Sequence, residues 1–270
     1  MEPSGIPALV RGKIPPRWRA GASPAVEYLA APVAGHRRIR RFVIVSGPRT
    51  GSELLRELLD SLPDVQCEGE LLQRPKRWPV AYLNGRAALG GTGREAWGCK
   101  ILDSHLHEGM ANSRPDGEQA LVELCADGWT ILNLRRRDVL AQALSFLHAM
   151  QGQWHFRAPS GFTPFEADPA AVIALLYVLD GNARWLDERL AEVPHTTVSY
   201  EDDLRPPEKR EATLRRVADL LGVAAAAATT DLHAGAPARP QDRITNMADV
   251  VRALEQTRFA PLAHLSAEES

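Results

Sequence analysis

One short stretch near residue 50 limits the possible folds of this chain more strongly than its bulk properties do. Residues 43–55 read VIVSGPRTGSELL. The apolar, β-branched run Arg41–Ser46 is typical of a buried parallel strand. A helix over Glu53–Leu62 is expected next, because leucines recur there on one helical stripe and Pro63 then ends it. A strand, a tight turn and a helix in this order predict the first unit of an α/β fold.

The turn between the strand and the helix has the composition of an anion-binding loop. Backbone amides after Gly47 would point into a concavity at the helix N-terminus, where a dianion binds. Arg49 adds a permanent charge with forked donors, and Thr50 and Ser52 add hydroxyls. Gly51 allows a ligand to approach the backbone. The turn therefore predicts a P-loop-like site for a phosphate-like group.

The turn could also be an ATPase loop or the capped start of a helix. The ATPase loop G-x-x-x-x-G-K-[ST] does not match, because Gly47 and Gly51 are one residue too close and no lysine follows Gly51. We therefore do not expect this loop to bind a magnesium–triphosphate complex as the ATPase loop does. Thr50 and Glu53 match a capping box, in which the turn would only begin a helix. Residues 43–55 by themselves do not distinguish an anion-binding site from a capped helix start.

The rest of the chain alternates between strand and helix patterns. The predicted strands cover Trp97–Leu102, Trp129–Leu134 and Thr196–Tyr200, and the predicted helices cover Glu118–Ala126, Asp138–Met150, Asp168–Ala191, Glu208–Leu221 and Met247–Gln256. Residues 73–95 and 152–165 are expected to be loops. This pattern predicts one α/β domain over 39–270, with a central, mostly parallel sheet flanked by helices. The Pro- and Gly-rich residues 1–38 are expected to form an extended or disordered arm.

Charge and cysteine usage exclude several classes of protein. A net charge of -2 over 270 residues argues against a dedicated nucleic-acid binder. Three scattered cysteines without a CxxC pair favour a reducing cytoplasm over a disulfide scaffold or a zinc site. His105 and His107 lie close to Asp103 and Glu108 in sequence, but we expect no metal there. No apolar window is long enough for a membrane span.

A second basic motif follows the strand that ends near Leu134. Arg135, Arg136 and Arg137 occur in a row, and Ser145 stands eight residues after Arg137 on the next predicted helix. An arginine fork with a hydroxyl suits a phosphate monoester. The alternative is an ordinary helix start with arginines at the surface.

The two motifs together resemble the sulfotransferases that use 3′-phosphoadenosine 5′-phosphosulfate (PAPS). PRTGS resembles their P-[RK]-[ST]-G-[ST]-[ST] phosphosulfate loop, from which Glu53 departs because a hydroxyl residue is usual there. The spacing of Arg137 and Ser145 resembles their 3′-phosphate site. The donor-binding residues that this resemblance implies are Pro48, Arg49, Thr50, Gly51, Ser52, Glu53, Leu54, Arg137, Ser145, Tyr200, Arg239 and Arg243.

Further segments resemble the bacterial trehalose-type branch of that superfamily. They are QALS at 142–145, QWH at 153–155 and SYEDDL at 199–204, and the whole resemblance covers about residues 40–262. It implies in-line transfer of a sulfuryl group to a hydroxyl of a small-molecule acceptor, a carbohydrate or a natural product, with no metal. Trp154 and His155 would line the acceptor pocket.

The resemblance also suggests which residues carry the chemistry. Glu70, which follows a glycine after the first helix, is the expected general base, with Glu68 and His105 as alternatives. Lys100 and Arg49 would neutralise charge on the leaving phosphate oxygen. Glu70 and Lys100 could also be ordinary surface residues. The competing functions are an ATP-dependent small-molecule kinase and a non-catalytic nucleotide-binding protein, and a homodimer is possible.

Overall fold

A computed structural model describes residues 39–74, 76–107, 117–151, 162–226, 230, 232 and 239–265. The predicted N-terminal arm and the predicted pocket residues Trp154 and His155 lie outside these residues. In the part that is described, no helix is both long and apolar enough to span a membrane.

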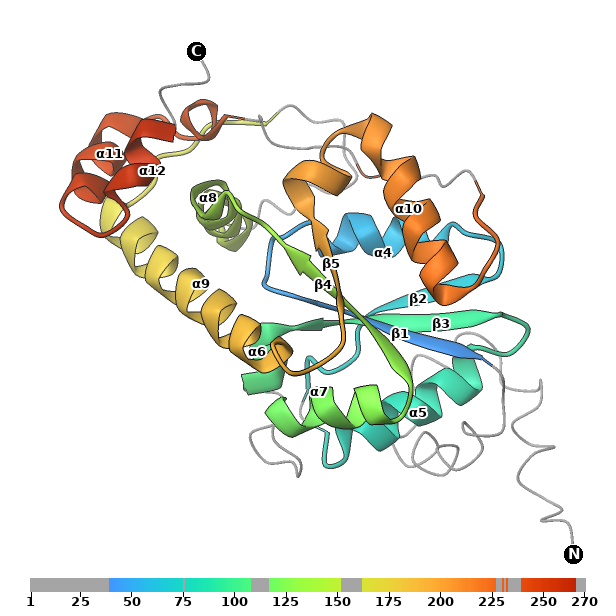
Figure 1. Ribbon diagram of the computed structural model, residues 1–270. Coiled ribbons are helices and arrows are strands. Elements are labelled where there is room, and N and C mark those ends of the chain that lie inside the picture. The colour runs from blue at the N-terminus through green and yellow to red at the C-terminus, as the bar shows by residue number, and fades with distance from the viewer. Residues whose placement is uncertain are drawn as a thin grey trace, which may run out of the picture.

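Five parallel strands form the centre of the molecule (Figure 1). They stand in the order β2-β3-β1-β4-β5. The strands are β1 (Arg40–Ser46), β2 (Val65–Glu70), β3 (Ala96–Leu102), β4 (Trp129–Arg135) and β5 (Thr196–Ser199). The predicted α/β fold with a central parallel sheet is confirmed.

The central position of β1 follows from its sequence. Phe42, Val43, Ile44 and Val45 are all fully buried, so both faces of this strand are covered. β1 pairs with β3 on one side and with β4 on the other. The connection that leaves β1 runs to β2 on one side of the sheet, whereas the connection that leaves β4 runs to β5 on the other side. In open parallel sheets, ligands bind at the carboxyl ends of the strands at such a switch point.

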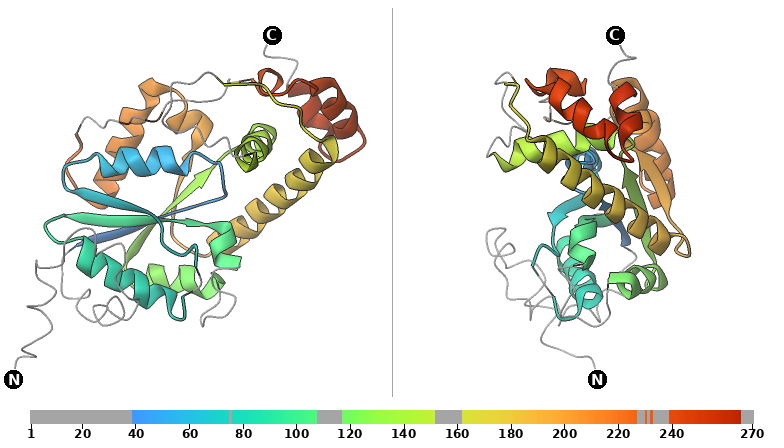
Figure 2. Two further views of the ribbon diagram at one scale, coloured as in Figure 1. Left: turned by 180° about the vertical axis from the view of Figure 1, so that it is seen from behind. Right: turned by 90° about the vertical axis from the view of Figure 1, so that its left-hand side faces the viewer.

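Helices cover both faces of the sheet (Figure 1). On one face lie α4 (Ser52–Asp60) and α10 (Pro207–Leu221), and on the other α5 (Pro79–Gly90) and α7 (Gly117–Ala126). A third group stands beyond the carboxyl ends of the strands (Figure 2). It contains α8 (Val139–Met150), α9 (Pro169–Leu190), α11 (Met247–Glu255) and α12 (Ala260–Leu265), which share a buried core of their own.

Short helical segments complete the carboxyl edge of the sheet. α6 (Asp103–His107) follows β3 directly, and a π-helical turn, η1 (Tyr200–Leu204), follows β5. A 3₁₀ turn, η2 (Pro240–Asp242), precedes α11. α6 and η1 begin where strands end, so they contribute side chains to the same edge as the β1–α4 turn.

Two parts of the sequence fold differently from the prediction. The expected loop at 73–95 is wrong between Pro79 and Gly90, where α5 packs on the sheet. Its glycines allow close packing rather than turns, since a Cβ at Gly90 would lie 2.5 Å from the indole nitrogen of Trp97. β2 was not predicted as a strand, because its sequence VQCEGE is polar, as befits the edge of a sheet.

Candidate active site

The turn between β1 and α4 contains two residues with a left-handed backbone. Arg49 and Gly51 both have left-handed φ angles, 59° and 92°. Alternation of left-handed and right-handed residues turns successive amides toward one side, which forms a nest. A non-glycine residue in this conformation costs roughly 1–2 kcal/mol, so contacts elsewhere must hold Arg49 in place.

The capping-box interpretation of this turn is wrong. Gly51 is the N-cap of α4, and no side chain caps that position. The hydroxyl of Thr50 donates instead to the carbonyl oxygen of Gly47 at 2.9 Å. The carboxylate of Glu53 pairs with Lys100 and Arg56 instead of forming the reciprocal bond of a capping box.

The structure brings together the two motifs that resemble the sulfotransferase donor site. Arg49 Nε donates to Ser145 Oγ at 3.0 Å. Gln142, one turn earlier on α8, donates through Nε2 to the carbonyl oxygen of Pro48 at 2.7 Å. One face of α8 therefore contacts the loop directly.

Arg136, the first residue after β4, is the arginine of this segment that reaches the loop. Its Nη1 donates to the carbonyl oxygen of Arg49 at 3.0 Å, and its guanidinium lies 4.7 Å from the centre of the Tyr200 ring. The side chain is only 9% exposed. Its Nε is buried without a hydrogen bond among the described residues, and the nearest carboxylate oxygen, of Glu201, is 4.0 Å away.

Arg137 lies on the outside of the same segment. Its side chain is 67% exposed and its Nη2 pairs with Asp202 Oδ1 at 2.6 Å. Its backbone nitrogen and that of Asp138 donate to the two carboxylate oxygens of Glu201, each at 3.1 Å. Glu201 thus satisfies amides at the start of α8. The structure therefore places Arg136, and not Arg137, next to Arg49, which itself bonds to Ser145.

A third arginine approaches from the C-terminal segment. Arg243 is 6% exposed, and its Nη1 donates to the carbonyl oxygen of Ala141 at 3.0 Å. Burial, together with the charge of Arg136, lowers its pKa to about 10. Burial and Arg136 likewise lower the pKa of Arg49 to about 10. Three arginines thus concentrate positive charge at one buried place, whereas Arg239 is exposed.

Tyr200 packs directly against the loop. A Cβ at Gly51 would lie 2.5 Å from Cδ2 of the Tyr200 ring. Gly51 is therefore required by its left-handed backbone and by this ring contact. The predicted donor-loop residue and the predicted residue of the YEDL-like segment thus form one packed unit with Arg136.

A small cavity of about 50 Å³ opens beside this unit. Thr50, Arg136 and Gln142 line it together with Asn133. Asn133 is 2% exposed, and its Oδ1 has no hydrogen-bond donor among the described residues. The cavity lies at the switch point between β1 and β4, and both polar and apolar side chains line it.

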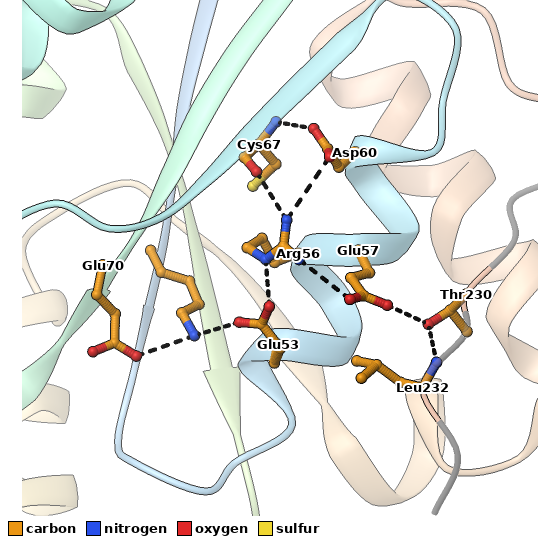
Figure 3. Close-up of polar contacts among 9 residues, drawn as sticks. Glu53, Arg56, Glu57, Asp60, Cys67, Glu70, Thr230 and Leu232 are labelled. Atoms are coloured by element: carbon orange, nitrogen blue, oxygen red, sulfur yellow. Dashed lines mark hydrogen bonds and ion pairs between the residues drawn. The ribbon is translucent and has the colours of Figure 1, made fainter. Parts of the chain in front are cut away.

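Lys100 lies between two carboxylates on the β2 side of the site. It is 5% exposed, and its Nζ lies 2.8 Å from Glu53 Oε2 and 3.1 Å from Glu70 Oε1. Glu53 and Glu70 are labelled in Figure 3, where dashed lines mark these two ion pairs. Glu53 also accepts from Arg56 Nε at 2.7 Å. Burial raises the pKa of Glu53, but the hydrogen bonds and charges of Lys100 and Arg56 outweigh it, so the pKa is lowered.

The two candidate glutamates of β2 face different surroundings. Glu70 lies beside Lys100 and beside His105 Nε2, which is 3.6 Å from its Oε2. Glu68 pairs with Arg86 of α5 and accepts from Trp97 Nε1 at 3.3 Å. An irregularity in the β2–β3 register between these glutamates separates them. The structure therefore brings Glu70, and not Glu68, to Lys100 and His105.

No family model matches this chain. A comparison with curated proteins finds no significant match either. The functional conclusion therefore rests on the residues and geometry of the site.

Proposed function

We propose that this protein binds PAPS and transfers its sulfuryl group to a hydroxyl of a small-molecule acceptor. One observation carries the proposal: the contact of Arg49 with Ser145, beside the buried guanidinium groups of Arg136 and Arg243. Two anion-binding motifs that are far apart in the sequence meet there. PAPS carries two separate anionic groups, the 5′-phosphosulfate and the 3′-phosphate, so each motif could bind one of them.

The chemistry of the residues present fits such a ligand. The amides of the left-handed turn and Arg49 would hold the 5′-phosphosulfate. Ser145, Arg136 and Arg243 would hold the 3′-phosphate, since forked guanidinium donors suit a phosphate monoester. The buried Nε of Arg136, which has no hydrogen bond among the described residues, is a donor that such an anion would satisfy.

The proposed reaction assigns a role to each side of the site. Bound PAPS supplies an activated sulfuryl group attached to a phosphate leaving group. Glu70 takes the proton of the acceptor hydroxyl at a carboxylate oxygen, as that oxygen attacks sulfur. Arg49 stabilises the negative charge that builds on the leaving phosphate oxygen. Lys100 adds positive charge next to Glu70 and orients that carboxylate.

The surroundings of Lys100 weigh against the kinase alternative. A kinase of the P-loop type needs a lysine for the β- and γ-phosphates. Lys100 is engaged by Glu53 and Glu70, so it does not replace that missing lysine. The non-catalytic alternative would keep the arginines but would not need Glu70 beside Lys100. We also propose that the protein acts in the reducing cytoplasm, since Cys67, Cys99 and Cys125 are free thiols.

Ligand-induced thermal stabilisation tests the proposal. Adenosine 3′,5′-bisphosphate should raise the melting temperature in the presence of EDTA, whereas ATP with Mg²⁺ should not. At 100 times its Kd, the bisphosphate should add roughly 2.7 kcal/mol to the free energy of unfolding. A melting temperature unmoved by the bisphosphate would overturn the proposal, and stabilisation by ATP with Mg²⁺ alone would favour the kinase.

A further inference from the structure

Each carboxylate oxygen of Glu70 has a different nitrogen beside it. Lys100 Nζ, from β3, lies 3.1 Å from Oε1, and His105 Nε2, from α6, lies 3.6 Å from Oε2. Glu70 also stands at one end of the series of ion pairs in Figure 3, which runs on through Glu53 to Arg56. Nitrogen atoms from two elements of the fold thus lie next to the carboxylate, and the one from Lys100 forms an ion pair with it.

A backbone contact determines which nitrogen of His105 carries the proton. The amide of Leu102 donates to His105 Nδ1 at 3.2 Å. An amide N–H is only a donor, so Nδ1 must be the acceptor, and the neutral ring then carries its proton on Nε2. This nitrogen lies 3.6 Å from Glu70 Oε2, just beyond hydrogen-bond distance. His105 is 7% exposed, which keeps the ring in this arrangement.

The same contact removes His105 from the role of general base. A neutral imidazole has one lone pair that can accept a proton. In His105 this lone pair, on Nδ1, is occupied by the Leu102 amide. The ring therefore offers the site a donor and no basic nitrogen.

We propose that His105 is a positioning residue for the general base, and that its Nε2–H orients the carboxylate of Glu70 toward the acceptor hydroxyl. This inference rests on the proposed function. In the reaction the acceptor O–H bond breaks, the proton goes to Glu70, and the oxygen electron pair forms the new bond to sulfur. The S–O bond to the 5′-phosphate of PAPS breaks at the same time, and its electron pair leaves with adenosine 3′,5′-bisphosphate. His105 neither gains nor loses a proton. Lys100 and His105 together fix the plane of the carboxylate, which has to meet the hydroxyl within hydrogen-bond reach.

The tautomer can be measured in the full chain without substrate. In protein labelled with ¹⁵N-histidine, long-range ¹H–¹⁵N spectra distinguish a protonated from an unprotonated ring nitrogen, and the His105→Gln variant assigns the signals. We expect His105 to show a protonated Nε2 and an unprotonated Nδ1 at neutral pH. Its Nε2 signal should shift in Glu70→Gln.

His195 provides a matched control within the same spectrum. Its Nδ1 lies 2.8 Å from the carbonyl oxygen of Val193, which can only accept, so its proton belongs on Nδ1. His195 should therefore show the opposite pattern and should not respond to Glu70→Gln. A His105 ring protonated on Nδ1, or one whose signals ignore Glu70→Gln, would overturn the proposal.

Kinetics test the positioning role itself. A glutamine side chain can replace the Nε2–H donor, whereas leucine cannot. With labelled PAPS and trehalose or simple phenols as acceptor probes, His105→Leu should lower kcat roughly tenfold or more. His105→Gln should retain most of the activity, and both variants should keep the Kd for adenosine 3′,5′-bisphosphate within about twofold.

A double-mutant cycle separates positioning from general stability. In the Glu70→Gln background, His105→Leu should cost less than about threefold in residual kcat, because the carboxylate that it orients is gone. An equal cost in both backgrounds would overturn the proposal. If no acceptor is sulfated and the bisphosphate does not bind, the proposed function fails, while the NMR measurement still decides the contact between His105 and Glu70.

Discussion

The guanidinium of Arg49 donates a 3.0 Å hydrogen bond to the hydroxyl of Ser145, although the two residues are 96 positions apart. Arg49 belongs to the turn after β1, and Ser145 lies on the helix after β4. Because β1 and β4 are neighbours in the sheet, the segments that leave their carboxyl ends meet. The sheet order thus joins two motifs that the sequence presents separately.

Arg136→Ala should weaken binding of adenosine 3′,5′-bisphosphate by at least about tenfold, since it removes a buried charged donor that also holds the Arg49 carbonyl. Arg137→Ala is the matched control. Arg137 is 67% exposed and joined to Asp202, so its loss should change the affinity less than about threefold. Titration calorimetry at fixed salt measures both, and a larger loss for Arg137→Ala would return the 3′-phosphate role to Arg137.

Glu70→Gln should lower kcat by roughly 10²–10⁴-fold, because it removes the proposed base and keeps the shape of the side chain. The Kd for the bisphosphate should stay within about twofold, since Glu70 contacts Lys100 and His105 rather than the arginines. Single-turnover assays and calorimetry check the two expectations. If Glu68→Gln lowered kcat as far while Glu70→Gln did not, the base would be Glu68.

Gly51→Ala should destabilise the protein by two separable effects. The left-handed backbone at φ 92° costs an alanine roughly 1–2 kcal/mol. The contact of the new methyl with the Tyr200 ring, at 2.5 Å, adds a similar cost from overpacking, about 1–3 kcal/mol. Urea unfolding measures the sum.

The ring contact at Gly51 can be tested by a second substitution. In the Tyr200→Ala background, Gly51→Ala should cost only the backbone part, because the ring that the methyl meets has been removed. An unchanged cost in that background would show that the tyrosine is not packed on the loop.

Glu53→Gln should lower the free energy of unfolding at neutral pH by about 1 kcal/mol, because the ion pairs with Lys100 and Arg56 lose one charge. The folded-state pKa of Glu53 is lowered, so its charge stabilises the protein above the unfolded pKa of a glutamate, about 4.3. This contribution is lost as the pH falls through the folded pKa. The difference between wild type and variant should therefore shrink in acid.

Urea unfolding between neutral and acid pH checks the Glu53 expectation. Glu57→Gln is a suitable control on the same helix, since Glu57 lies 3.4 Å from Arg56 Nη2 and its other oxygen accepts from Thr230 at 2.9 Å. The carboxylates that pair with Lys100 are instead those of Glu53 and Glu70. A difference for Glu53→Gln that grew in acid would contradict the ion-pair assignment.

Much of the backbone was predictable from local patterns. The apolar run before Gly47 predicted β1, and periodic leucines predicted α4. The strand at Trp129 and the helix after Asp138 were also predicted, so the order of the two motifs was known in advance. Such elements are recognisable because burial imposes a period of two or 3.6 residues on the chain itself.

Side-chain direction at the ends of these elements was harder to predict. Arg136 could have been found from the period of two, since it continues the buried face of Leu132 and Leu134. The register irregularity between Glu68 and Glu70 has no comparable signal, and period two would have placed both on one face. Glu53 matched a capping box locally, yet its partners are Lys100 and Arg56.

The amino-acid pattern was therefore sufficient for the α/β architecture, for the turn at Gly47–Gly51 and for the candidate arginine and serine residues. The contact of Arg136 rather than Arg137 with the loop, the contact of Glu70 rather than Glu68 with Lys100, and the partners of Glu53 depended on packing between distant elements. The physical reason is that local periodicity reports which face of an element is buried. Which charge meets which partner depends on strand order and on helices that lie far away in the sequence.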